Sequence, residues 1–398
     1  MPYHLAIRDH LREHVSAVFE QLGSDELTAK HAEELDLSLL KATYRLEPES
    51  HPTLYGIAAE AAERLDLEVQ VDLYRGTSDG ELNAALYYAP GAARVVLYGP
   101  LEERLERDEL LALFGHELAH HLLFTAERGE LFTATRALHA LDGAEASSSV
   151  LATARMWQLT TETFADRGGW LASGSADAVI RCLLKTQTGS SDVDAQAYLA
   201  QAEEVLERAG SGSEEFSHPE TFLRAKALSL YASDPEGAAE GIARLLEGQI
   251  ELDALDLIRR VELTELSRDI VDHLLAPRWF RTAAVIGHAR LLFDDYDVKV
   301  PARTAAQIAE AMGEYGETVH DYLSYLMLDF VAVDPSLEEL PIAQAQWLAE
   351  PLGLLERLEK GMNKELKITK RVIKSVRARQ AALLAAALAA DTQAEGTS

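Results

Sequence analysis

Cysteine and positive charge are both scarce in this 398-residue chain. The single cysteine, Cys182, excludes an internal disulfide and a cysteine-rich metal site. It lies in an apolar run with helical spacing, where we interpret it as a small buried residue. Lys and Arg number 37 against 66 Asp and Glu, which gives a net charge of −29 at pH 7. Because this charge repels a phosphate backbone, nucleic acid is not an expected partner.

Long apolar runs are also missing. The longest candidate, residues 381–390, is alanine-rich and falls well short of the roughly 20 residues that span a bilayer. Residues 1–10 mix charges and lack the apolar core of a secretory signal. Hydrophobic residues still make up 47% of the chain, enough for sizeable cores. We therefore expect a soluble, cytoplasmic protein of two or three domains with no transmembrane segment.

Helical periodicity dominates the chain, and β patterns are confined to one short region. Residues 4–65 predict three helices. Residues 67–73, 83–88 and 93–98 predict strands, and nearly everything from residue 129 onward is again helical. This order predicts a mainly α fold with a small antiparallel β-sheet, of the α+β class.

The segment 115–121, Gly-His-Glu-Leu-Ala-His-His, carries the clearest chemical signal. His116 and His120 are one helical turn apart, so both imidazoles project from one helix face. That spacing suits two nitrogen ligands of one zinc ion. Glu117 lies beside them, placed to take a proton from a zinc-bound water. The pattern also arises by chance, so the interpretation requires a third ligand elsewhere.

Glu162 is the candidate for that ligand. It lies in a predicted helix over 148–171, and Asp166 follows one turn later on the same face. Asp166 could accept the outer N–H of a ligating histidine and so fix the ring tautomer. The alternative is an ordinary acidic helix face, which is common in a chain this acidic.

Taken together, these segments resemble the gluzincin metallopeptidases that include HtpX, the CAAX prenyl endopeptidases and the Oma-type proteases. The resemblance covers roughly residues 55–235. It rests on motifs in the family's order: Asn83-Ala84 before a β run, the strand 93–98, His116 to His120, Glu162 to Asp166, and Ser217-His218-Pro219 followed by Arg224.

The resemblance implies a zincin-like metallopeptidase domain and a set of residue roles. His116, His120 and Glu162 would bind one Zn²⁺ per chain. Glu117 would act as general base and then acid, and Asp166 would lie behind the metal ligands.

The resemblance also implies roles in substrate handling. His218 would hydrogen-bond the developing oxyanion, and Arg224 would orient substrate or an active-site carboxylate. Asn83 would contact substrate. The strand that holds Val95, Val96 and Leu97 could bind an extended peptide by adding it as a further strand.

Four segments follow from these assignments. We expect N-terminal helices over 1–54 that pack on the peptidase, the zincin-like metallopeptidase domain over 55–235, a helical domain over 236–390 and a flexible tail over 391–398. In the helical domain, residues 322–334 and 347–354 loosely resemble TerB-like domains, although a plain helical bundle explains the pattern equally well.

The segment from Lys360 to Arg379 differs from the rest of the chain because it is rich in Lys and Arg. Its apolar residues fall near one face, so it predicts a basic amphipathic helix. Such a helix would dock to an acidic partner, dock to an anionic surface, or pair with carboxylates of this protein.

The sequence thus predicts a hydrolase, a zinc-dependent metalloendopeptidase of the HExxH type. It would cleave a protein or peptide substrate with a zinc-activated water and Glu117 as general base. The alternative is a catalytically silent, zinc-stabilised protein-interaction module. The presence of Glu117 argues against that alternative, since a binding module needs no base there.

Overall fold

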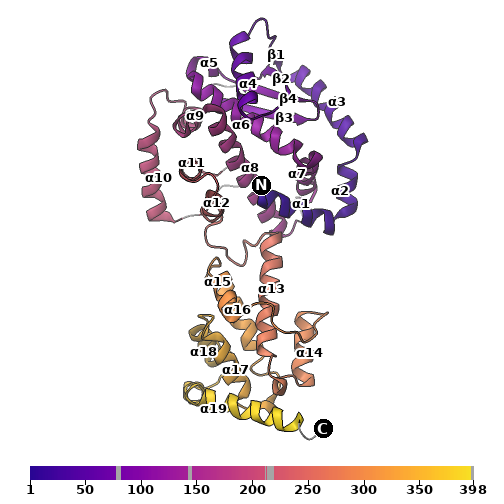
Figure 1. Ribbon diagram of the computed structural model, residues 1–398, viewed down its shortest axis with the longest axis vertical. Helices are drawn as coiled ribbons and strands as arrows, with labels where there is room; N and C mark the ends of the chain where they lie inside the picture. The colour runs from indigo at the N-terminus through magenta and orange to yellow at the C-terminus, as the bar shows by residue number, and fades with distance from the viewer. Residues whose placement is uncertain (78–81, 142–145, 211, 213–218, 396–398) are drawn as a thin grey trace. The chain divides into compact units, whose positions relative to one another are not determined.

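The computed structural model describes residues 1–77, 82–141, 146–210, 212 and 219–395, and Figure 1 labels its helices and strands. The chain divides into two compact units. Unit 1 consists of Met1–Gly248 and Asp256–Ile258, and unit 2 of Gln249–Leu255 and Arg259–Ser398. Each unit has a hydrophobic core of its own. The predicted mainly α fold with a small β-sheet is confirmed.

The boundary between the units lies later than the expected one at 235–236. The sequence predicts that the helix α12 (Ala238–Glu247) belongs to the helical domain, whereas the structure includes it in unit 1. The reason is its apolar face, because Ile242 and Leu246 are buried in one cluster with Leu159 and Leu223. The turn at 233–237 therefore separates two helices of one core.

Unit 1 is a helical unit around one four-stranded sheet. Its elements before the motif helix are α1 (Pro2–His14), α2 (Ser16–Leu22), α3 (Asp25–Ala42), β1 (Tyr44–Arg45), α4 (Pro52–Arg64), β2 (Gln70–Arg75), β3 (Asn83–Ala89), β4 (Ala92–Tyr98) and α5 (Leu101–Arg104). They continue with α6 (Arg107–Thr125), η1 (Ala126–Gly129), α7 (Glu130–Leu141), α8 (Ser148–Ser173), α9 (Ala176–Thr188), α10 (Ala195–Ala209), α11 (Thr221–Ser233) and α12.

The strands are ordered β1-β2-β4-β3 in the sheet. The prediction of an antiparallel sheet is correct for the pairs β1–β2 and β3–β4, but β2 and β4 run parallel. A two-residue turn at Pro90 and Gly91 joins β3 to β4, and Gly91 has the positive φ of 99° that such a turn favours. This hairpin places β4 beside β2, in the position that a simple meander would give to β3. As a result β3 forms an edge of the sheet.

Both faces of the sheet are covered, which explains why β4 is buried along almost its whole length. On one face, Val95 and Leu97 share a core with Phe114 of α6. On the other face, Val96 packs with Leu39 of α3. Because side chains alternate along a strand, β4 contributes to the packing on both faces of the sheet.

The helix α6 carries the His-Glu motif and is buried on nearly all sides. Its start is defined by a capping box between Glu106 and Glu109. Glu109 is fully buried and also accepts hydrogen bonds from Lys185 Nζ at 2.7 Å and Arg181 Nε at 3.0 Å, both on α9. These contacts hold the beginning of α6 against α9 and so fix the helix that presents the motif.

The described residues of unit 2 form helices, with one isolated β-bridge between Ile250 and Tyr315. The helices are α13 (Leu257–Leu274, whose first two residues belong to unit 1), η2 (Arg278–Phe280), α14 (Ala283–Leu292), α15 (Ala305–Met312), α16 (Glu317–Asp329), η3 (Pro335–Leu337), α17 (Leu340–Ala349), α18 (Leu355–Lys364) and α19 (Lys370–Glu395).

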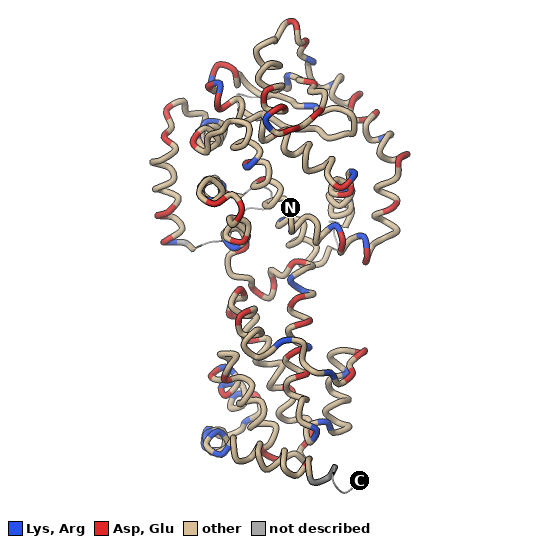
Figure 2. Tube along the Cα trace, in the orientation of Figure 1, with Lys and Arg blue, Asp and Glu red and all other residues tan. Residues whose placement is uncertain are grey.

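The basic segment Lys360 to Arg379 is two helices rather than the predicted single one. The break lies between α18 and α19, where Lys367 has a positive φ of 57°. Lys and Arg residues are frequent along these two helices and are coloured blue in Figure 2. Arg379 pairs with Glu339 at 2.8 Å and Arg377 lies 3.6 Å from Glu359, so some of the charge is neutralised within unit 2. An acidic partner stays a prediction.

Candidate metal centre

Two helices bring the three predicted metal ligands together. His116 and His120 lie on α6, and Glu162 lies on α8. The Nε2 atoms of the two histidines are 3.2 Å apart. Each of them is 3.6 Å from a carboxylate oxygen of Glu162. No other group of His, Cys, Asp and Glu side chains among the described residues offers three ligand atoms at such close range.

The spacing of these atoms fits a tetrahedral zinc ion. Zinc–nitrogen bonds of about 2.0–2.1 Å at tetrahedral angles place two ligand atoms about 3.3–3.4 Å apart. The observed separations of 3.2 and 3.6 Å bracket this value. Two neutral imidazoles and one carboxylate are also ligands that zinc prefers, and they leave a fourth position for water or substrate.

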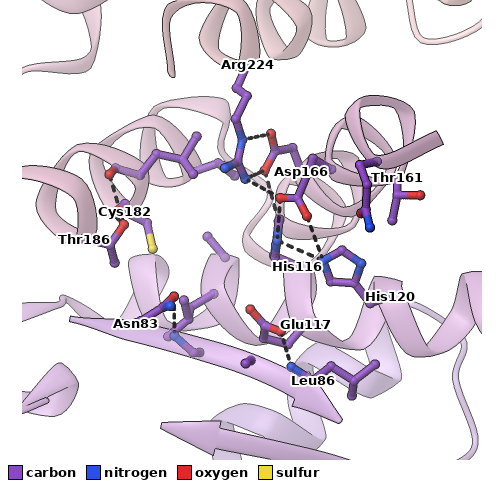
Figure 3. Close-up of a pocket in the computed structure, with 18 of the residues that line it drawn as sticks. Asn83, Leu86, His116, Glu117, His120, Thr161, Asp166, Cys182, Thr186 and Arg224 are labelled. Atoms are coloured by element: carbon purple, nitrogen blue, oxygen red, sulfur yellow. Dashed lines mark hydrogen bonds and ion pairs between the residues drawn. The ribbon is translucent and has the colours of Figure 1, made fainter. Parts of the chain in front are cut away.

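Asp166 and Arg224 form a charged pair behind the ligands, seen at the top of Figure 3. His116 Nδ1 lies 3.0 Å from Asp166 Oδ1, so the ring donates its outer N–H and leaves Nε2 free for a cation. Arg224 donates to both oxygens of Asp166, at 2.6 and 2.7 Å. Its Nη2 also lies 3.5 Å from Glu162. Arg224 thus contacts two carboxylates of the centre, and the role in orienting a carboxylate that the resemblance implies for it stays a prediction.

The electrostatics of the centre follow from burial and from these pairs. Burial alone would lower the pKa of His116, but the hydrogen bond to Asp166 and the charge of Glu162 raise that pKa above its usual value. Burial lowers the pKa of His120 to about 4, against the opposing charge of Glu162. Burial would raise the pKa of Asp166, yet the Arg224 charge holds it well below the ordinary range.

Glu117 is buried on the sheet side of α6 and does not join the three ligands. Its Oε2 accepts a hydrogen bond of 2.7 Å from the backbone N–H of Leu86 in β3, as drawn in Figure 3. Burial raises the pKa of Glu117, partly offset by the neighbouring His116. A carboxylate with a raised pKa accepts protons more readily, which suits a general base.

A cavity of about 440 Å³ lies against the three ligands. One wall is β3, from Asn83 to Leu86, and another is α9. Val95, Val96 and Leu97 do not contribute to it, because β4 is hydrogen-bonded on both edges and these residues are buried. The expectation that their strand binds a peptide is therefore wrong. The free edge belongs to β3, where Asn83 lies.

Several residues of the cavity wall carry no chemical motif and were not predicted. Gln158 and Thr161 lie on α8 one turn and one residue before Glu162, so helical periodicity could have identified them. Cys182 is buried as predicted and lies in the wall formed by α9. The other unpredicted wall residues include Ala85, Leu86, Ala112, Leu113, Phe124, Val179, Leu183 and Thr186.

Two further histidines complete the comparison with the sequence. His218 lies outside the described residues. His121 is buried away from the ligand group, with its ring 5.3 Å from that of Tyr88. Burial lowers the pKa of His121 to about 4, so it is a neutral packing residue.

Comparisons with known proteins agree with this geometry. Residues 48–232 match the profile described as Peptidase family M48. We refer to these residues as the M48 domain, after the family that they match. A stretch of 43 residues is also 46% identical to the CAAX prenyl protease 1 homolog of Dictyostelium discoideum. That stretch is 11% of this chain and 10% of the relative, so the likeness is local. No solved structure matches the chain.

The M48 domain covers the elements from just before α4 to almost the end of α11, and it includes all three candidate ligands, Glu117, Asp166 and Arg224. The helices α1 to α3 precede it. No helix in the described parts of the chain combines the length and the apolar character needed to cross a membrane.

Proposed function

We propose that the M48 domain is a zinc-dependent endopeptidase that hydrolyses peptide bonds in protein or peptide substrates. The observation that carries the proposal is the convergence of His116, His120 and Glu162, from two helices, on one point beside a cavity. Glu117 and the edge strand β3 line the same cavity as these three residues.

His116, His120 and Glu162 would hold the zinc ion, and Asp166 would keep His116 in the tautomer that presents Nε2. When bound, zinc lowers the pKa of a coordinated water toward 7 and polarises a carbonyl oxygen. Arg224 balances the negative charge of Asp166, which stays ionised behind the site, and its Nη2 also lies 3.5 Å from Glu162.

Glu117 would move the protons of the reaction. Its carboxylate accepts a proton from the attacking water and returns it to the leaving amine. The Leu86 N–H holds that carboxylate at the edge of β3, along which an extended peptide can lie. Leu86 therefore holds the general base and also belongs to the strand beside which the substrate would lie.

The substitution Glu117→Gln tests this proposal. We expect the variant to bind about one zinc per chain, as the wild-type protein does, and to lose hydrolysis of an unfolded protein substrate by at least 10²-fold. His116→Ala and Glu162→Ala should lose both zinc and activity, because each removes a ligand. Metal analysis and a cleavage assay on the same preparations check both readouts.

The matched control is Glu63→Gln on the exposed side of α4, which should behave as wild type. Undiminished cleavage by Glu117→Gln would contradict the mechanism. Wild-type protein that binds zinc but cleaves nothing would instead favour the zinc-stabilised interaction module.

A further inference from the structure

The edge of β3 is open along only part of its length. In a strand, the N–H and C=O groups of alternate residues point to the same side. The N–H of Leu86 donates to Glu117, outside the sheet, so residue 86 faces away from β4. Ala84 and Tyr88, two residues before and after it, face the same way. The N–H of Ala84 also donates within the protein, to Asn83 Oδ1 at 2.9 Å, so the outward carbonyls are the groups that a substrate strand could pair with.

Two of the three outward-facing carbonyls are available and the third is taken. Among the described residues, none donates a hydrogen bond to the carbonyl of Ala84 or of Leu86. The carbonyl of Tyr88 accepts a hydrogen bond of 3.1 Å from Nε2 of His31. The cavity wall agrees with this count, because it follows β3 from Asn83 to Leu86 and does not include Tyr88.

His31 is held in this position by its surroundings. Its ring lies 5.5 Å from that of Phe132, which in turn lies 4.5 Å from the ring of Tyr88. The helix that carries it, α3, is fixed to the sheet by a bidentate pair between Asp36 and the buried Arg94. The contact is therefore part of the packing of α3 on β3.

We propose that His31 of α3 ends the peptide-binding edge of β3 and so limits how far a substrate extends on that side of the cleaved bond. The inference rests on the proposed function and adds to it a specificity-determining residue that lies outside the M48 domain, which begins at residue 48. A peptide strand can donate hydrogen bonds to the carbonyls of Ala84 and Leu86, whereas His31 already occupies the carbonyl of Tyr88.

Substrate length is the measurement that tests the proposal. A peptide that wild type cleaves, and Glu117→Gln does not, is extended by two residues at a time at either end. For wild type, extension at one of the two ends should stop raising kcat/KM once the peptide has reached Leu86. In His31→Ala, the next two residues on that side should raise kcat/KM by about threefold to tenfold, the effect of one added backbone hydrogen bond. The gain should come through KM, with kcat unchanged.

Two variants control for an effect on folding or on the helix. His31→Gln retains an N–H donor and should keep the wild-type length limit. Lys30→Ala alters an exposed neighbour on α3 and should also keep it. Identical length profiles for wild type and His31→Ala, with both enzymes active, would overturn this inference and leave the proposed function intact. Absence of any Glu117-dependent cleavage would overturn both.

Discussion

Asp166 is not one of the three candidate ligands, yet the arrangement of the centre depends on its carboxylate. It accepts hydrogen bonds from the outer N–H of His116 and from Nε and Nη2 of Arg224, and all three side chains are largely buried. A buried carboxylate without partners is costly, and the Arg224 guanidinium supplies the compensating charge. The same charge keeps Asp166 ionised, which in turn keeps the His116 ring fixed.

Asp166→Asn should weaken zinc binding about 10–100-fold, because the amide is a poorer acceptor for the His116 N–H and leaves Arg224 unneutralised. A competition titration against a chromophoric chelator measures the change. Asp192→Asn, at an exposed position far from α6 in sequence, serves as the control. An unchanged zinc affinity in Asp166→Asn, with the fold retained by circular dichroism, would show that the orienting bond has no role.

At the scale of elements, the site depends on how closely α6 and α8 approach. Gly115 of α6 and Gly168 of α8 lie at their contact, together with Ala119. A Cβ atom added at Gly168 would lie 2.8 Å from the carbonyl oxygen of Gly115 and would overlap the side chain of Ala119. Only small residues therefore let Glu162 of α8 reach the histidines of α6.

Gly168→Ala should consequently separate the two helices. We expect a loss of about 1–3 kcal/mol in the free energy of unfolding, as for other overpacked cores, together with weaker zinc binding. The control is Gly56→Ala in α4, where an added Cβ meets nothing within 4 Å. That change should be neutral or should stabilise by up to about 1 kcal/mol. Denaturant titration of both variants checks the contrast, and equal stabilities would refute the close-contact argument.

The sequence predicted the elements better than their arrangement. The spacing of His116 and His120 and the pattern around Glu162 are local in the chain, so these candidate ligands could be predicted without knowledge of the fold. The position of β4 in the sheet depends on which strands pair, which the alternation of residues does not encode. The same holds for His31, whose contact with β3 joins segments more than fifty residues apart.

At the scale of the whole molecule, the chemistry and the basic charge lie in different units. Every candidate ligand, the cavity and β3 belong to unit 1. Residues 357–379 of unit 2 hold nine Lys or Arg and two Glu in a chain with a net charge of −29. Since each unit has its own core, each should unfold as a separate cooperative transition.

Zinc removal should therefore destabilise one transition and leave the other unchanged. A metal that binds only the folded state adds about 4 kcal/mol at a concentration 1,000 times its Kd. Calorimetry with and without a chelator should show a lower Tm for the unit 1 transition alone. His116→Ala should show that lower Tm whether or not the chelator is present. Leu348→Ala, in the core of unit 2, should shift only the other transition and so identifies it. A chelator that shifts both transitions equally, or neither, would contradict a zinc centre confined to unit 1.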